Sequence, residues 1–233
     1  MFRIIFFSFL IWSCSSPVEA PYADSYTPIS VGDKTQLVFL GDSSTYLFSI
    51  IGKTKRTDGE IAYIQTLRYS VKIDTTTITQ LHSNYLAITN GYLVVTRLNP
   101  VDSNYFYFKE NPYIEQRIAK PFPNDSDTWV QIVPRQDSDY LVAEYLGHLE
   151  TATKSYKNVF GFNLFDAGDE FQDVDYYAKG MGWIGSPVYL CTYKKVSGKE
   201  FGSLWPEKPL TWLFDDFTLL DKKGINSIWF FHR

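Results

Sequence analysis

Residues 86–96 have the sequence LAITNGYLVVT, in which two β-prone apolar runs flank the dipeptide Asn90-Gly91. Tight two-residue turns prefer Asn-Gly, and such turns match the twist of the two strands that they connect. We therefore expect residues 86–89 and 92–98 to form an antiparallel β-hairpin. This is the strongest short hairpin signal in the chain.

Similar short runs of β-branched and aromatic residues follow one another along the chain, with a turn signal roughly every ten residues. Besides the two above, they are residues 36–40, 45–51, 61–69, 75–81, 105–109, 114–119, 128–133, 140–146, 159–165, 188–195, 217–220 and 225–231. No long segment has the apolar spacing of an amphipathic helix, and we expect helix only as short turns around residues 205–216. The pattern predicts an all-β fold with little helix: a single antiparallel domain built as a curved sheet, a half-barrel or a sandwich.

The composition agrees with one folded domain and restricts its partners. Of the 233 residues, 45% are hydrophobic and 21% are charged, a balance that excludes an intrinsically disordered protein. The formal net charge is −4, so the strongly basic character of many nucleic-acid-binding domains is absent and we expect no nucleic-acid partner. We assign residues 27–233 to a single β domain.

The N-terminus has the features of an export signal. Arg3 supplies one positive charge, and residues 4–12 are apolar apart from Ser8. This run is too short to span the hydrocarbon core of a bilayer as a helix, but its length is typical of a secretory signal. We assign residues 1–13 to a signal peptide.

Residues 10–14, LIWSC, resemble the end of a bacterial lipoprotein signal. Ile11 stands three positions before Cys14, and the small Ser13 stands directly before it, as in that family of signals. The resemblance implies cleavage before Cys14, acylation of this cysteine by several chains including palmitate, and a tether over residues 14–26. It also implies a lipid-anchored protein of the bacterial cell envelope, at the outer membrane or the cell surface.

Two other fates of the N-terminus remain open. Cleavage after residues 18–20, VEA, would release a soluble secreted protein, although Pro21 generally opposes such processing. An uncleaved segment would leave Cys14 as an ordinary thiol, free to pair with Cys191, the only other cysteine. The apolar, β-prone surroundings of Cys191 predict a buried, inert thiol rather than a nucleophile.

Three further stretches resemble a family of uncharacterised bacterial envelope lipoproteins. Residues 26–33, YTPISVGD, are similar to the family's Tyr-x-Pro-Leu-x-x-Gly-Asn/Asp opening, and residues 153–159, TKSYKNV, to its Gly-x-Phe-x-Asn-Val motif. Residues 176–184, YYAKGMGWI, resemble its Tyr-x-x-Lys-Gly-Val-Gly-Leu-Ile element. The resemblance implies a curved antiparallel sheet, broadly like that of periplasmic lipoprotein carriers, and it implies no activity.

Two glycines suggest a structural task for residues 178–184. Gly180 and Gly182 can adopt backbone conformations closed to other residues, so we expect a bulge or tight bend here. Trp183 and Ile184 would then continue the strand into the core. A ligand-binding loop is the alternative.

Residues 166–175 contain the densest group of acids in the chain: Asp166, Asp169, Glu170, Asp173 and Asp175. Their oxygens could bind a cation such as Ca²⁺, but their spacing is not that of a calcium-binding loop. We favour a solvated loop between Phe165 and Tyr176, and we predict no metal site and no cofactor.

No catalytic motif stands out. The histidines, His82, His148 and His232, are far apart and lack metal-ligand spacing. Neither a Gly-x-Ser-x-Gly nucleophile turn nor a phosphate-binding glycine-rich loop occurs. We therefore name no catalytic residue and expect a non-enzymatic protein, with a glycan hydrolase based on two carboxylates as the enzymatic alternative.

Aromatic residues gather in two places. In residues 105–108, YFYF, the tyrosines share one face of a strand and could stack on sugars or line an apolar groove. The alternative is an ordinary sheet surface that uses tyrosine as a strand former. Residues 229–231, WFF, must dock against the domain or against a partner.

The sequence as a whole predicts a membrane-anchored bacterial lipoprotein that acts as a non-enzymatic binding or structural module of the cell envelope. Its partner would be a protein, a glycan or an apolar ligand. One alternative is a carrier of an apolar ligand or lipid in a concave sheet, and the other is the glycan hydrolase. An apolar cavity of several hundred Å³ would favour the carrier, a cleft with two facing acids the hydrolase, and a filled core the structural module.

Overall fold

The computed structural model of the chain describes residues 22–39, 44–73, 76–100, 113–133, 139–150, 155–202 and 204. Every regular element in these ranges is a strand, and none is a helix that could cross a membrane. The strands are β1 (Lys34–Phe39), β2 (Thr45–Lys55), β3 (Ile61–Ile73), β4 (Thr76–Thr89), β5 (Tyr92–Thr96), β6 (Glu115–Ala119), β7 (Thr128–Val130), β8 (Ile132–Val133), β9 (Tyr140–Tyr145), β10 (His148–Glu150), β11 (Ser155–Lys157), β12 (Val159–Phe165), β13 (Phe171–Ala178), β14 (Gly182–Gly185), β15 (Tyr189–Val196) and β16 (Lys199–Gly202).

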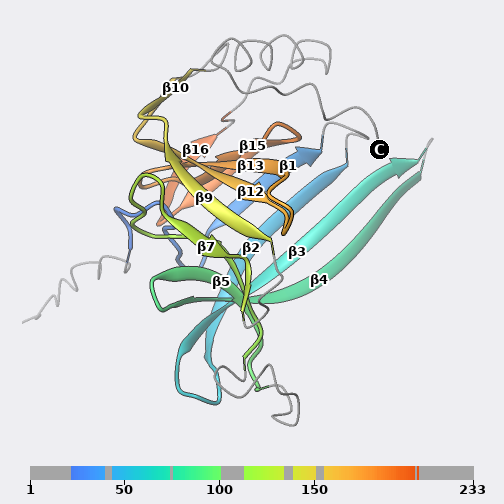
Figure 1. Ribbon diagram of the computed structural model, residues 1–233. Coiled ribbons are helices and arrows are strands. Elements are labelled where there is room, and N and C mark those ends of the chain that lie inside the picture. Colours follow the sequence, from blue (N-terminus) through green and yellow to red (C-terminus); the bar gives the residue numbers. More distant parts are fainter. Residues whose placement is uncertain are drawn as a thin grey trace, which may run out of the picture.

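Fourteen of these strands form one sheet, in which every pairing is antiparallel. Their order is β7-β9-β12-β13-β14-β15-β1-β2-β3-β4-β5-β6-β8, with β16 beside β15, and the remaining pair, β10 and β11, forms a small sheet of its own. The large sheet curves until its two edges nearly meet (Figure 1). The prediction of an all-β, single antiparallel domain is confirmed in its curved-sheet form.

One residue joins the two edges of the sheet. Edge strands β7 and β8 are separated only by Gln131, so the run that we expect as one strand over residues 128–133 is divided between opposite edges. The Gln131 N–H donates to the carbonyl of Asp139, next to β9, and its carbonyl accepts from the N–H of Arg117 in β6, both at 2.7 Å. The backbone therefore bridges the seam.

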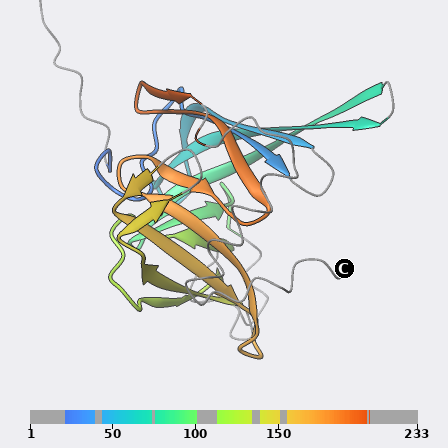
Figure 2. The ribbon, with the colours of Figure 1, turned by 90° about the horizontal axis from the view of Figure 1, so that it is seen from above.

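The hairpin at Asn90-Gly91 forms as predicted, with φ of 51° and 79° at its two central residues. The prediction that residues 75–81 and 86–89 are separate strands is wrong, because β4 continues from Thr76 to Thr89. Strand β3 pairs with β4 from Ile73↔Thr76 to Tyr63↔Leu86. The polar residues between the two apolar runs thus keep their backbone hydrogen bonds, and no glycine or proline interrupts them. The far end of the β3–β4 hairpin projects beyond the rest of the described chain (Figure 2).

Two clusters of buried side chains stabilise the sheet. The first contains Tyr177 of β13 together with side chains of β2, β4, β5, β9 and β12. The second contains the neighbouring residue Tyr176, and it includes Leu149 and Tyr156 from the β10–β11 pair. Adjacent residues join different clusters because successive side chains of a strand point to opposite faces. This part of the sheet is therefore covered on both sides.

The segment before β1 packs against the sheet. Tyr26 is buried, its ring meets Phe160 edge-on at 5.0 Å, and its N–H donates to the carbonyl of Pro121. Ser25 is also buried. Packing thus begins at least two residues before residue 27, where we place the start of the domain. The predicted elements at residues 105–109, 205–216, 217–220 and 225–231 lie outside the described residues.

Candidate functional site

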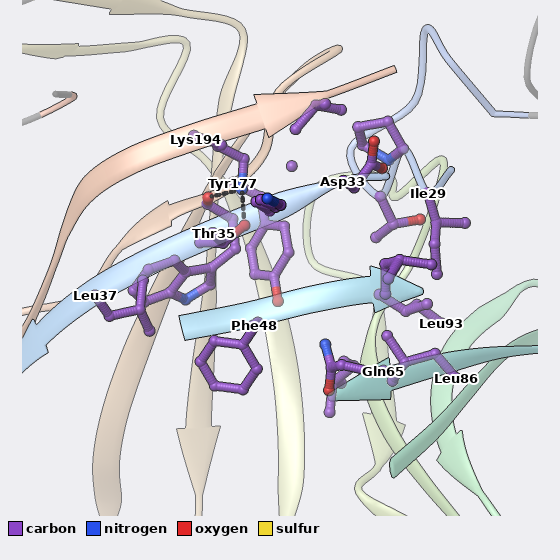
Figure 3. A pocket seen from close by; sticks show the side chains of 18 of the residues that line it. Ile29, Asp33, Thr35, Leu37, Phe48, Gln65, Leu86, Leu93, Tyr177 and Lys194 are labelled. Carbon is purple, nitrogen blue, oxygen red and sulfur yellow. Dashed lines mark hydrogen bonds between the residues drawn. The ribbon is translucent and has the colours of Figure 1, made fainter. Parts of the chain in front are cut away.

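A cavity of about 460 Å³ opens inside the curve of the sheet (Figure 3). Strands β1 to β6, strands β13 to β15 and residues 27–29 of the N-terminal segment contribute to its wall. Most of the wall is apolar, and its main apolar side chains are Leu37, Phe48, Ile50, Leu67, Leu86 and Val95. A cavity of this size and character is typical of sites that hold small apolar molecules.

Strand pairing explains how this wall is assembled. Phe48 of β2 stands opposite Thr35 of β1 on one side and opposite Leu67 of β3 on the other. In the neighbouring strand pair, β3 and β4, Gln65 stands opposite Asn84. Directly paired residues of antiparallel strands point to the same face, so these side chains line the cavity as one surface.

The glycine-containing turn between β13 and β14 closes another part of the wall. Gly180 and Gly182 have φ of 72° and 75°, and the β13–β14 register shifts between Tyr176 and Tyr177. The predicted tight bend is thus confirmed. Met181, Gly182 and Trp183 also line the cavity, so a turn expected mainly for structural reasons borders the candidate site.

Lys194 places a buried ammonium group in the cavity wall (Figure 3). The residue is 4% exposed, and its Nζ donates to Oγ1 of Thr35 at 3.1 Å and to the carbonyl of Trp183 at 2.8 Å. Thr35 is the residue opposite Lys194 in the β1–β15 pair. Burial lowers the pKa of the Lys194 amine, an effect that electrostatic interactions with Cys191 and Asp33 partly oppose.

Asp33 also lies in the wall, and its carboxylate hydrogen-bonds two separate backbone segments. Its Oδ2 accepts from the N–H of Ser30 at 2.7 Å, and its Oδ1 accepts from the N–H of Ser197 at 2.8 Å. Burial raises the pKa of the Asp33 carboxyl, while these two hydrogen bonds act in the opposite direction. Both oxygens are thus engaged in joining the N-terminal segment to the turn between β15 and β16.

Asp175 of β13 contributes a carboxyl group whose ionisation falls near neutrality. Its Oδ1 accepts from Nε1 of Trp183 at 2.6 Å. Burial raises the pKa of Asp175 to about 7, the Trp183 hydrogen bond lowers it, and the negative charge of Asp173 raises it. Burial likewise raises the pKa of Asp173 to about 6. Asp175 can therefore donate a proton in a hydrogen bond at mildly acidic pH.

The prediction of a solvated loop over the acidic residues is wrong in its second half. Asp166 does organise a turn: its Oδ1 accepts from the N–H groups of Gly168 and Glu170 at 2.8 and 2.9 Å. Strand β13 begins at Phe171, however, so Asp173 and Asp175 are strand residues. Pairing with β12 overrides the low strand propensity of aspartate. Within the described ranges, no three His, Cys, Asp or Glu residues are grouped so that they could hold a metal ion.

The other residues singled out in the sequence lie elsewhere. Cys191 is buried, as predicted. His82 is exposed on β4 of the large sheet, whereas His148 lies on β10 of the small sheet. The ring of His148 hydrogen-bonds the Ser155 hydroxyl at 3.1 Å. The proposed lipid anchor Cys14, together with His232 and residues 105–108 and 229–231, lies outside the described residues.

The sequence did not indicate the polar groups of the cavity. Lys194 stands beside a second lysine in a strand, and no local pattern distinguishes the inward side chain from the outward one. A bulge in β15 opposite Gln36 and Leu37 shifts the alternation of inward and outward side chains along this strand. Counting residues from the apolar start of β15 therefore does not show which lysine points inward. Comparisons with protein-family models, with curated proteins and with solved structures give no match for this chain.

Proposed function

We propose that this protein is a binding module of the bacterial envelope that holds an apolar ligand in the cavity of its curved sheet. The cavity carries this proposal: about 460 Å³ of largely apolar space lies where a purely structural module would have a filled core. Among the functions considered from the sequence, this feature favours the carrier of an apolar ligand or lipid.

The enclosure of the cavity supports the same function. A small apolar molecule leaves water most completely when protein surrounds it on several sides, and here two stretches of one sheet and the N-terminal segment contribute walls. Leu86 and Ile50 are buried, and Leu67 is half-buried, so the wall combines a firm core with side chains that border open space. A bound alkyl chain would contact all three.

Ligand binding can be tested with a substitution that places a larger side chain in the cavity. Leu67→Trp adds bulk inside the cavity and is expected to abolish binding of decanol, a probe with an apolar chain and no charge. The full chain would be held in lipid nanodiscs, and radiolabelled decanol would be partitioned by equilibrium dialysis against empty nanodiscs. The excess of decanol in the compartment that contains the protein, relative to the compartment with empty nanodiscs, measures binding to the protein.

Leu81→Trp is the matched control. Leu81 is 66% exposed on β4 and stands opposite Arg68, the neighbour of Leu67, so it projects from the other face of the same hairpin. This variant should bind decanol as well as the wild type does. Equal loss in both variants, or no excess of decanol on the wild-type protein, would overturn the proposal.

We also propose that Cys14 anchors the protein to a membrane. Seven residues separate Cys14 from Tyr22, where the described chain begins, and the eight Cα–Cα steps between the two residues span at most about 29 Å. An anchor there would keep the cavity close to the lipid surface. Intact mass of the protein from solubilised bacterial membranes tests this: we expect loss of residues 1–13 and added acyl chains, both abolished by Cys14→Ala. An unprocessed chain, or one that begins at Pro21, would contradict it.

A further inference from the structure

Two cations are buried in the described part of the chain, and their surroundings differ sharply. Arg56, 5% exposed, forms ion pairs with Asp58 and with Glu115, the latter at 3.0 Å. Lys194, 4% exposed, has no carboxylate within salt-bridge distance among the described residues. Buried charges without a partner are costly, and proteins usually pair them.

The hydrogen bonds of Lys194 leave one donor for a ligand. An ammonium group has three N–H donors, and here two are directed at Thr35 and at the carbonyl of Trp183. The amine makes no third hydrogen bond to a described residue. Because β1 and β15 are paired at Thr35 and Lys194, the amine is held in place before any ligand arrives.

The two carboxyl groups of this wall, Asp33 and Asp175, form no ion pair with Lys194, although the charge of Asp33 is near enough to act on its pKa. Asp33 uses both oxygens to accept backbone N–H groups. Asp175 already accepts from Trp183, and with its pKa near 7 its carboxyl is protonated in part of the molecules at neutral pH. A protonated carboxyl donates a hydrogen bond, so it also suits a ligand group that accepts.

We propose that the cavity takes a single-chain amphiphile whose anionic carboxylate head accepts a hydrogen bond from the ammonium group of Lys194. The inference rests on the proposed function, which requires only an apolar ligand, and adds the chemistry of the head group. The alkyl chain lies along the apolar wall formed by Phe48, Leu67 and Leu86, and the head lies against Lys194, Thr35 and Trp183.

The test compares three probes of equal chain length: decanoate, decanol and decylammonium. Affinities for the full chain in nanodiscs would be measured by equilibrium dialysis against empty nanodiscs at pH 6.5. We expect decanoate to bind about tenfold more tightly than decanol, because charge-assisted hydrogen bonds are the stronger ones, and decylammonium to bind weakest. Lys194→Met should remove the preference for decanoate over decanol.

Lys195→Met is the matched control. Lys195, the next residue of β15, pairs with Glu200 at 3.6 Å and has a side chain 36% exposed, so its charge lies outside the cavity. This variant should keep the wild-type preference. If Lys194→Met does not fold, as judged by near-ultraviolet circular dichroism, the wild-type ranking of the three probes still decides.

Two results would have different meanings. Equal affinity for decanoate and decanol in the wild type, with both excluded by Leu67→Trp, would overturn the head-group inference and leave the apolar-ligand function standing. Failure of all three probes to bind would instead overturn the proposed function itself.

Discussion

Asp175 shows how much a single residue depends on its surroundings. In water an aspartate carboxyl ionises near pH 4, but in the folded chain burial raises the pKa of Asp175 to about 7. Between these two values the folded protein binds more protons at this residue than the unfolded chain does. By linkage, its contribution to stability decreases as pH rises from about 4 to about 7 and is constant above that range.

The pH dependence of stability can be tested at this residue. In the wild type the free energy of unfolding should fall between pH 4 and pH 7, and we expect this fall to be smaller by roughly 2 kcal/mol in Asp175→Asn. This difference is less than the full pKa shift implies, because the Asp175 carboxyl borders an open cavity. Urea unfolding at a series of pH values would measure it. Asp173, with its pKa raised to about 6, contributes a slope of the same sign that remains in the variant.

The control for this experiment is Glu60→Gln in the exposed turn between β2 and β3. It also removes one carboxylate and should leave the slope as in the wild type. A slope that Asp175→Asn does not change would show that burial does not hold the proton on this carboxyl.

At the scale of elements, the Asn90-Gly91 turn is the clearest case in which local sequence sufficed. Gly91 has φ of 79°, a conformation that glycine adopts without cost and other residues adopt with strain. A Cβ atom added to Gly91 would meet nothing within 4 Å, so steric contact cannot contribute. Any cost of a larger residue here comes from the backbone alone.

Gly91→Ala is therefore expected to lower the free energy of unfolding by about 1 kcal/mol. Denaturant unfolding would measure the change. Gly52→Ala in β2 is the comparison, because a Cβ there would lie 3.6 Å from Cδ1 of Ile64, an ordinary contact, and φ is not in the left-handed region. We expect Gly52→Ala to change stability by less than about 0.5 kcal/mol. Equal effects of the two substitutions would contradict this explanation.

Strands β4 and β13 show where local sequence was insufficient. The polar residues 82–85 suggested a break in β4, and the aspartates suggested a loop where β13 runs. In both cases a neighbouring strand supplies the hydrogen bonds, β3 to β4 and β12 to β13. Partner strands distant in sequence outweigh the weak preferences of single residues.

At the scale of the whole molecule, closure of the sheet depends on the backbone of Gln131. Its N–H and carbonyl connect the two edges, to Asp139 and Arg117 respectively. These two hydrogen bonds tie the edges of the sheet together and so help to hold its curve.

Gln131→Pro removes the N–H of this bridge and is expected to reduce the free energy of unfolding by about 1–3 kcal/mol. Hydrogen exchange should accelerate at the amides of β6 and β9 before other strands are affected, because the seam opens locally. Gln131→Ala keeps the N–H and should leave the exchange of these strands close to that of the wild type. Unchanged exchange in Gln131→Pro would mean that other contacts close the sheet.

The sequence by itself determined the fold class of this protein and many of its strands. Alternation of apolar residues, turn residues such as Asn90-Gly91, and the glycines at positions 180 and 182 act over a few neighbours, so their effect is visible in the chain alone. The signal segment and Cys14 are local in the same sense, and they remain a prediction.

Only the tertiary structure decided where the sheet closes, that a cavity remains inside it, and which polar groups face that cavity. Thr35 and Lys194 are 159 positions apart in sequence, yet strand pairing brings them into hydrogen-bond contact. Asp175 and Lys194 have ordinary side chains whose chemistry changes because burial removes them from water. Burial and pairing between distant strands are properties of the assembled sheet, and no short stretch of sequence contains them.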